Sequence, residues 1–281
     1  MTTMQLHLQT VPARNGLLWL RHGFKVFQRR PLALSGLFAL FLLAGFVLTL
    51  LPRVGVLLLV ATLPLLSLGF MLATHLVLQN RTPNAGVFLA PLKLTAERRR
   101  SQLMLGGAYA LATVLIMLLS DAVDGGSLDA LQTLMAKPEP GNPAYEQAVA
   151  AALTEPRLLA GMLTRLGLAA LLSVPFWHAP ALVHWGGQGA LQALFSSTLG
   201  VWRNKGAFAL NALGWAGLTL LLSALLSLVT GLLGVPQLLY MLAMPLGLLL
   251  STVFYTSLYF TFVDCFMFGA PRELPPSQQP S

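Results

Sequence analysis

"GFKVFQRRPLALSGLFAL" (Gly23–Leu40) decides the fold, because a basic amphipathic segment runs directly into uninterrupted apolar sequence at Pro31. At about 100° per residue, the apolar and cationic side chains of residues 15–28 separate onto opposite halves of a helix, with Leu18 as the exception. Such a helix lies in the membrane plane, with its apolar face in the acyl boundary and its cations on the headgroups. Pro31 suits the first turn of the next helix, whose N–H groups lack intrahelical partners. We expect headgroup contacts from Arg21, Lys25, Arg29 and Arg30.

The cations of this first segment have three interpretations. They bind lipid headgroups, each contributing about 1 kcal/mol near an anionic leaflet. They act only as a topogenic signal that fixes the orientation of the first span. Alternatively, the helix that carries them packs beneath a bundle of membrane spans.

A similar pattern appears about 175 residues later, at "GVWRNKGAFALNALG" (Gly200–Gly214). The preceding "GALQALFSSTLGVW" (Gly189–Trp202) predicts a second in-plane helix, and Arg203 and Lys205 are further candidate headgroup contacts. A pair of apolar spans follows each amphipathic segment, which suggests a parallel internal repeat. Apolar runs also align by chance, so the repeat is one of two interpretations.

Pro64 and Pro245 support the repeat, because each lies ten residues after a valine near the start of the second span in its unit. Proline inside a helix removes a backbone hydrogen bond and favours a kink. Matching interruptions in two halves of a chain mark binding sites in some transporters.

The composition is that of a membrane protein. Of 281 residues, 56% are hydrophobic and 9% charged, against roughly 25% charged in soluble domains. The mean hydropathy is +0.73. A net charge of +8 suggests nucleic acid in a soluble protein, but here the cations flank apolar spans, so we expect membrane lipids as partners and no nucleic acid. A single cysteine excludes an internal disulfide and a cysteine-based zinc site.

Six segments are long and apolar enough to span a bilayer core, which needs about 20 helical residues. They predict an all-α, polytopic bundle with the two in-plane helices on its cytoplasmic side. The first apolar run begins after residue 31 and lacks an A-x-A-like cleavage site, so we expect it to be retained. The expected parts are an amphipathic segment (1–31), a membrane domain (32–262) with spans at about 32–51, 54–78, 102–120, 158–177, 206–229 and 236–262 and an outer segment at 121–157, and a disordered cytoplasmic tail (263–281).

The positive-inside rule orients the chain. With the N-terminus inside, the inner segments hold thirteen of the seventeen Lys and Arg residues, whereas the outer segments hold Arg53, Lys137 and Arg157. We therefore expect a multi-pass protein with both termini in the cytoplasm. The outer segment contains "NPAYEQAVAAALTEP" (Asn142–Pro156), which predicts a helix that extends the fourth span outward.

Three polar residues are candidates for an intramembrane site. Arg165 interrupts the fourth span, and a charge within a span is a functional hypothesis by default. It also lies near enough to the outer boundary for its side chain to snorkel to the surface. Asn211 and Asp264 are the other polar candidates, in the fifth span and at the end of the sixth.

"WHAPALVHWGGQGALQALFSSTLGVWRNKGAF" (Trp177–Phe208) and "VPARNGLLWLRHGFKVFQRRPLAL" (Val11–Leu34) resemble uncharacterised six-span inner-membrane proteins of proteobacteria. The chain is more distantly similar to the membrane domain of some glycerophosphodiester phosphodiesterases. The resemblance implies a helical bundle in the bacterial inner membrane and no particular activity. The chain has no soluble phosphodiesterase domain, so that activity does not follow.

Three functions compete. The leading hypothesis is a non-enzymatic accessory or scaffold protein linked to envelope or lipid homeostasis. The alternative is a small transporter or channel with a path near Arg165 and Asn211. An enzyme is third, because the chain contains no H-E-x-x-H, Walker A or G-x-S-x-G motif and no other catalytic, metal or cofactor-binding constellation. Protein partners and homo-oligomers remain open.

Overall fold

The structure is a computed structural model that describes residues 6–52, 54–139, 141–235 and 237–268. Arg53, Pro236 and the tail from residue 269, including Arg272, lie outside the described residues. The expectations that depend on them, the outer position of Arg53 and disorder in the tail beyond 268, stay predictions.

Six long helices confirm the expected all-α bundle of membrane spans, and each is long and apolar enough to cross a bilayer. The fourth continues beyond a short break as α9 (Ala179–Gly186). Several helices extend past the predicted apolar limits because helix formation, unlike bilayer insertion, accepts polar residues at its ends. The six spans are α2 (Pro31–Thr49), α3 (Gly55–Leu78), α5 (Ala96–Asp124), α8 (Pro156–Phe176), α11 (Lys205–Leu232) and α12 (Gln237–Cys265). Of these, α5 and α11 extend past the predicted limits at both ends, whereas α3 lies within them.

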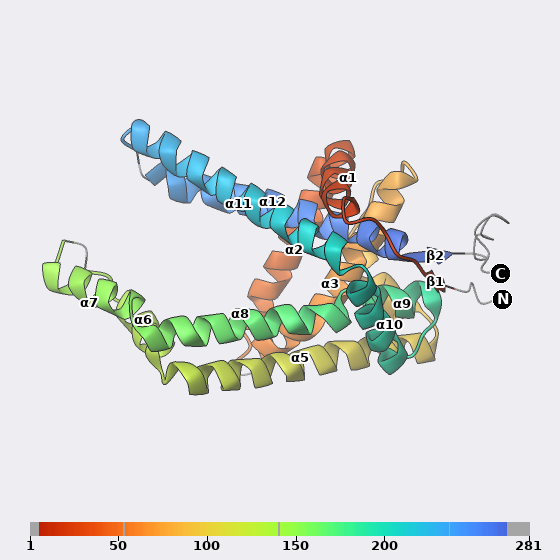
Figure 1. Cartoon of the computed structure of the whole chain (residues 1–281), viewed down its shortest axis with the longest axis horizontal. Coiled ribbons are helices and arrows are strands. Elements are labelled where there is room, and N and C mark those ends of the chain that lie inside the picture. The colour runs from red at the N-terminus through yellow and green to blue at the C-terminus, as the bar shows by residue number, and fades with distance from the viewer. Residues whose placement is uncertain (1–5, 53, 140, 236, 269–281) are drawn as a thin grey trace, which may run out of the picture.

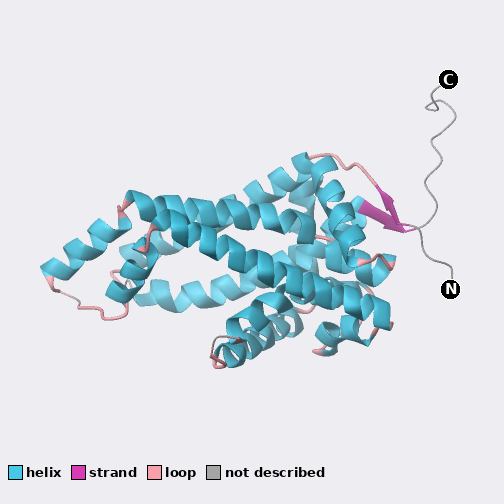
Figure 2. Cartoon of the chain, turned by 90° about the horizontal axis from the view of Figure 1, so that it is seen from below, coloured by secondary structure: helices cyan, strands magenta, loops and turns pink. Residues whose placement is uncertain are grey.

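The spans form three hairpins, α2–α3, α5–α8 and α11–α12, within which the partners contact each other. In Figure 1 the α5–α8 and α11–α12 hairpins diverge from the end at which both chain termini lie. We call this the terminal end, and the opposite end, with α6 and α7, the distal end. Figure 2 shows the same elongated helices from below, with the strands beside the termini.

A short antiparallel ribbon closes the terminal end. Strand β1 (Leu6–Leu8) pairs with β2 (Phe266–Phe268), which follows α12 directly. The first residues of the expected disordered tail are therefore part of α12 and β2. The ribbon links the N-terminal segment to the end of α12, and no local pattern in the sequence predicted it.

Helix α3 lies at the centre of the assembly, where it contacts α2, α5 and α12. Its close approach to α5 depends on Gly106, since a methyl group there would lie 2.5 Å from the carbonyl oxygen of Ala61. Small residues permit such close packing between membrane helices. Pro64 is buried within α3, whereas Pro245 within α12 is exposed. The two prolines therefore have different environments.

Both predicted amphipathic segments are helical, as α1 (Asn15–Arg29) and α10 (Ala190–Arg203). The backbone leaves helical geometry at Arg30 (φ −145°, ψ 58°) and Asn204 (φ −108°, ψ 22°), immediately before α2 and α11. Helix α1 packs on α11 and α12, whereas α10 packs on α8 and α9. Each of the two helices directly precedes a hairpin of spans, but they pack against different helices. Whether they lie in the membrane plane remains a prediction.

The connections contain more helix than predicted. The distal segment forms α6 (Ser127–Met135) and α7 (Pro143–Leu153), and the α3–α5 connection contains α4 (Gly86–Leu89) and the 3-10 turn η1 (Ala90–Lys93). The expectation that α7 continues into the fourth span is wrong. Glu155 is extended (φ −62°, ψ 120°), as expected before Pro156, because proline disfavours helical geometry in the preceding residue.

Candidate functional site

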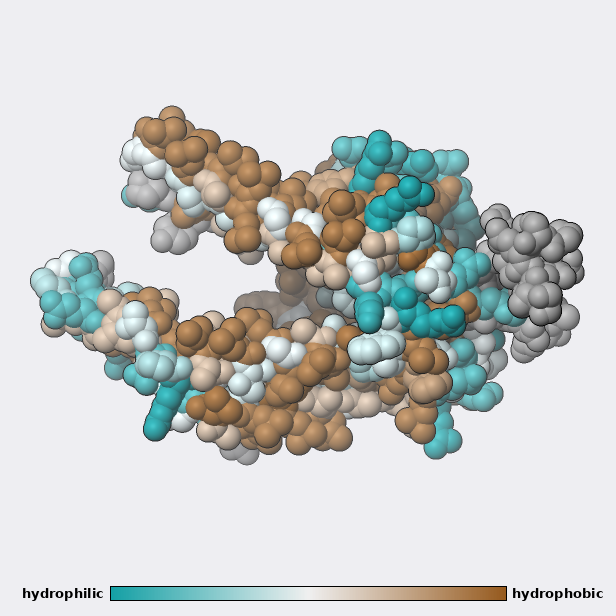
Figure 3. Space-filling model, viewed as in Figure 1, coloured by the Kyte–Doolittle hydropathy of each residue, from teal (hydrophilic) through white to brown (hydrophobic). Residues whose placement is uncertain are grey.

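The terminal end carries a concentration of positive charge. Figure 3 shows hydrophilic residues gathered there, while the surfaces of the diverging hairpins are largely hydrophobic. Among the described residues, Glu97 and Asp264 are the acids of this end. Twelve described cations lie in its segments, a set that we call the basic cluster: Arg14, Arg21, Lys25, Arg29, Arg30, Arg81, Lys93, Arg98, Arg99, Arg100, Arg203 and Lys205.

Helix α1 presents part of this cluster because its opposite face is buried. Gly16, Trp19, Gly23 and Val26 are buried, at the spacing of one helical face. Trp19 is fully buried, and its ring centroid lies 5.1 Å from that of Phe208 on α11. This packing leaves four predicted headgroup contacts exposed, namely Arg21, Lys25, Arg29 and Arg30.

The break between α10 and α11 exposes the other two predicted contacts, Arg203 and Lys205. The Nζ atom of Lys205 lies 5.2 Å from the ring centroid of Trp202, which is also exposed. An exposed indole beside a cation suits the membrane–water interface, where indole rings concentrate. The two cations thus flank the break on the surface.

Asn204, between these cations, is buried and holds the N-terminal segment. Its Oδ1 accepts from the backbone N–H of Val11 at 2.8 Å, and its Nδ2 donates to the carbonyl of Gln9 at 2.9 Å and to that of Gly200 at 2.9 Å. The same Nδ2 lies 3.4 Å from the Sγ of Cys265. This role could not be predicted from the sequence, because a single asparagine beside a cation carries no signal of a contact almost 200 residues away.

The basic cluster has no acidic partner within the described residues. Among the described residues, the ion pair that forms joins Arg165 and Asp121, at the distal end and away from the cluster. Arg98 donates through a guanidinium N–H to the carbonyl of His184 at 3.1 Å, which links α5 to α9 without neutralising its charge. The positive charge at the terminal end is therefore available to an external anion.

Asp264, a candidate for the intramembrane site, instead fastens α1 to α12. Its Oδ2 accepts from the indole N–H of Trp19 at 2.7 Å and from the side-chain amide of Asn15 at 3.0 Å. Hydrogen bonds to a charged acceptor are stronger than neutral ones. The carboxylate therefore has a structural explanation.

Arg165 and Asn211 lie apart from each other. Arg165 donates to the hydroxyl of Ser120 at 3.0 Å and to Asp121 at 2.6 Å, which joins the distal parts of α8 and α5. Asn211 is 2% exposed on the terminal side of α11, beneath Gly16 of α1, and its Oδ1 has no partner in the described residues. The structure does not bring these two residues and Asp264 together.

An apolar groove of about 410 Å³ lies between α2, α3 and the α4–η1 segment. Gly45 and Leu48 of α2 form one wall, and Leu89 and Leu92 close the groove from the connection. Lys93, adjacent to Leu92, is exposed and belongs to the basic cluster. The groove is lined almost entirely by apolar atoms, so it suits a hydrocarbon chain. Over the described part of the chain, no cluster of three or more His, Cys, Asp or Glu side chains is arranged to hold a metal ion.

A probable inner membrane protein of Burkholderia thailandensis is 30% identical to this chain over 271 residues, which cover 95% of the chain and 97% of the relative. No protein-family model matches the chain, and no solved structure matches it. The similarity extends over nearly the whole of both proteins, so the six spans and the terminal end are all included. The resemblance to glycerophosphodiester phosphodiesterases finds no support in this comparison.

Proposed function

The chain belongs to the inner membrane protein family of its Burkholderia relative, and on that premise we propose that it is a non-enzymatic accessory protein that binds anionic lipid at the cytoplasmic leaflet. It is a multi-pass membrane protein with six spans. Its role would lie in envelope or lipid homeostasis, as a scaffold around which anionic lipid gathers. The observation that carries the proposal is the exposed basic cluster without acidic partners.

Charge explains the choice of lipid. Lys and Arg residues near an anionic leaflet contribute about 1 kcal/mol each, and the effect fades within a Debye length. The buried face of α1 fixes the helix against the bundle, so Arg21, Lys25 and Arg29 share its opposite surface without further ordering of the backbone. The positive-inside rule also supports placing this end in the cytoplasm.

The groove between α2 and α3 supplies a place for an acyl chain. Its volume is about 410 Å³, and Lys93 stands beside Leu92 at its wall. An anionic phospholipid has a charged headgroup joined to hydrocarbon, which matches a cation beside an apolar groove. This arrangement supports lipid as the partner of the cluster.

The transporter alternative has less support. A polar path would need Arg165 and Asn211 to face one cavity. Arg165 instead pairs with Asp121 at the distal end, while Asn211 is buried beneath α1. Neither residue lines the cavities found between the spans.

The test is lipid retention in nanodiscs that contain equal amounts of phosphatidylglycerol and phosphatidylcholine, read by native mass spectrometry. The combined variant Arg29→Ala and Arg30→Ala removes about 2 kcal/mol of headgroup attraction, so phosphatidylglycerol retention should fall about thirtyfold. Added salt should weaken retention by the wild-type protein.

The matched control removes two exposed cations from the distal end, Lys137→Ala with Arg157→Ala. It lowers the net charge by the same amount. Six acids share the distal end with these two cations and offset their attraction for an anionic headgroup, so phosphatidylglycerol retention should stay within about twofold of wild type. Equal loss in the two double variants, or retention of both lipids in equal amounts by the wild-type protein, would contradict the proposal.

A further inference from the structure

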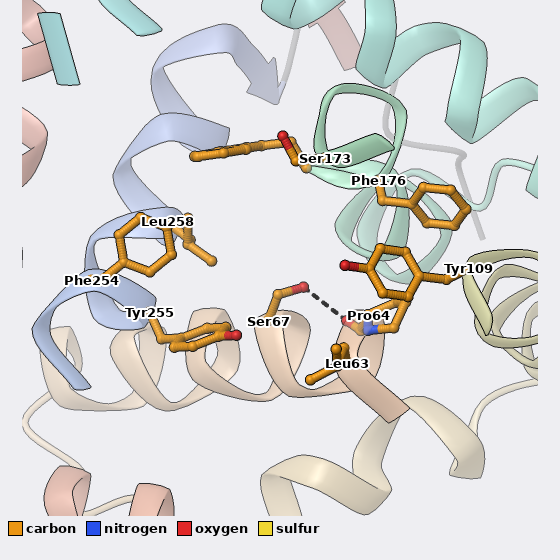
Figure 4. Close-up of a pocket in the computed structure, with 10 residues that line it drawn as sticks. Leu63, Pro64, Ser67, Tyr109, Ser173, Phe176, Phe254, Tyr255 and Leu258 are labelled. Atoms are coloured by element: carbon orange, nitrogen blue, oxygen red, sulfur yellow. Dashed lines mark hydrogen bonds between the residues drawn. The ribbon is translucent and has the colours of Figure 1, made fainter. Parts of the chain in front are cut away.

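A second cavity, of about 240 Å³, lies where α3, α5, α8 and α12 meet (Figure 4). It is separate from the groove of α2 and α3, and none of its lining residues is charged. Aromatic rings form much of its wall, from Phe176, Trp177 and Phe254. The cavity lies between membrane-spanning helices and is lined mainly by apolar atoms, which suits a molecule that is soluble in the bilayer.

Two tyrosine hydroxyls point into this cavity. Figure 4 shows Tyr109 and Tyr255 with their oxygen atoms directed into the same space from opposite walls. Neither hydroxyl has a hydrogen-bond partner among the described residues. A polar group without a partner in the hydrocarbon region is costly, so a hydroxyl placed there calls for an acceptor.

The serine hydroxyls of the cavity direct their own protons to backbone carbonyls, and neither accepts a hydrogen bond from Tyr109 or Tyr255 among the described residues. Ser67 donates to the carbonyl of Pro64 at 2.8 Å, and Ser173 donates to the carbonyl of Ala170 at 2.7 Å. Each serine O–H thus donates to a backbone carbonyl of its own helix. The tyrosine O–H groups remain as the donors that face the cavity.

A smaller cavity of about 220 Å³ adjoins the first along α12, and Phe254 and Tyr255 line both. Trp215 lines this second cavity, and its indole N–H is buried without a partner in the described residues. The two cavities share one face of α12, and Figure 3 shows a wide gap between the diverging hairpins. A ligand chain can therefore extend from the cavity into the bilayer.

We propose that this aromatic cavity binds the head of an uncharged, bilayer-soluble molecule with carbonyl oxygens, which accept hydrogen bonds from Tyr109 and Tyr255. The lining offers no countercharge, so burying a phosphate or a carboxylate there would be costly. Because the two tyrosine hydroxyls face the cavity from opposite walls, they favour a ligand head group with two hydrogen-bond acceptors. A quinone and a neutral diacylglycerol both have such a head group. The volume of about 240 Å³ holds a head group rather than a whole lipid.

The test measures binding of decylubiquinone and of dioctanoylglycerol to the detergent-purified full chain, by the rise in its thermal unfolding midpoint. A ligand that binds the folded state raises this midpoint by mass action. Dodecane, which has no oxygen, controls for simple partition into the cavity. At least one of the carbonyl probes should raise the midpoint at a concentration at which dodecane does not, and the stronger probe identifies the source as quinone or glyceride.

The variants Tyr109→Phe and Tyr255→Phe remove the donors and keep the rings, so the fold should persist. Each should weaken binding of the stronger probe about two- to tenfold, the range expected for one neutral hydrogen bond. Tyr145→Phe, in α7 at the distal end, is the matched control and should bind as wild type does.

Two results would overturn the proposal. One is the absence of a midpoint shift with both carbonyl probes. The other is a shift that persists unchanged in the Tyr109→Phe, Tyr255→Phe double variant, because binding would then not depend on the hydroxyls. This test changes no cation of the basic cluster, so its failure would leave the proposed binding of anionic lipid intact.

Discussion

Gly16→Ala should loosen the packing of the amphipathic helix α1 against α11. A methyl group at this position would lie 2.1 Å from the carbonyl oxygen of Ala207 and 2.7 Å from the backbone nitrogen of Asn211. Both atoms belong to the backbone of α11, which cannot yield as a flexible side chain does. Helix α1 must therefore withdraw by about 1 Å to reach an ordinary contact distance.

Withdrawal by this amount loosens the whole buried face of α1. A gap of 0.5–1 Å forfeits about a quarter to a half of the dispersion energy of each contact. The fully buried Trp19 and its hydrogen bond to Asp264 lie on that face. Overpacking of this kind costs about 1–3 kcal/mol, and the better helix propensity of alanine returns up to about 1 kcal/mol. The net loss should be about 1–2 kcal/mol.

Cys265 provides the assay. It is the single cysteine of the chain, is fully buried, and packs in the same cluster as Trp19. A thiol reagent should therefore label it when the terminal end opens. When opening is fast relative to labelling, the rate follows the open population, so a loss of about 1–2 kcal/mol raises the labelling rate about 5- to 30-fold.

Gly36→Ala is the matched control, because Gly36 lies in α2 with no atom within 4 Å of an added methyl group. Its labelling rate should equal or fall below that of wild type, since alanine favours the helix. If the rate for Gly16→Ala stays within twofold of that control, the contact between α1 and α11 does not hold the terminal end closed, and the argument is wrong.

Two further substitutions test the terminal and distal ends. Asn204→Ala should raise the labelling rate of Cys265 at least tenfold, because it leaves the partly buried backbone N–H of Val11 unpaired, at about 1–3 kcal/mol, and removes the hydrogen bond to the Gln9 carbonyl, worth about 0.5–1.5 kcal/mol; the exposed Asn84→Ala should not change that rate. Arg165→Ala should lower the thermal unfolding midpoint by less than about 3 °C, because its partly exposed ion pair contributes at most about 1 kcal/mol. A drop of more than about 8 °C would indicate a larger role for Arg165.

The sequence predicted the spans because bilayer thickness imposes a length and a composition that are local properties of the chain. The same holds for the amphipathic helices, whose period is local. The helix break before the fourth span was not predicted, although proline at position 156 disfavours helical geometry in the preceding residue. The alanine-rich sequence before it favoured one continuous helix. Local chemistry thus placed the six spans to within about six residues, whereas the β1–β2 ribbon and the short helices α4 and α6 of the connections were not predicted.

The candidate site depended on contacts that no local pattern contains. Asp264 was expected to serve an intramembrane polar site, but it accepts from Trp19, about 245 residues earlier in the chain. The facing hydroxyls of Tyr109 and Tyr255 come from α5 and α12, which meet only through packing around α3. A single sequence carries no signal for such pairs, whereas the cationic segments can be identified from the sequence by their charge.

The two faces of α1 can be perturbed independently, which separates the fold from the proposed function. Gly16→Ala changes the packing of the buried face and leaves every cation in place. The Arg29 and Arg30 substitutions remove charge from exposed positions and leave the buried Trp19 untouched. If lipid retention falls in the arginine variant while Cys265 stays protected, the cations act on lipid rather than on the fold. If protection and retention fall together, the cations hold α1 in place, and the lipid effect is a consequence of docking.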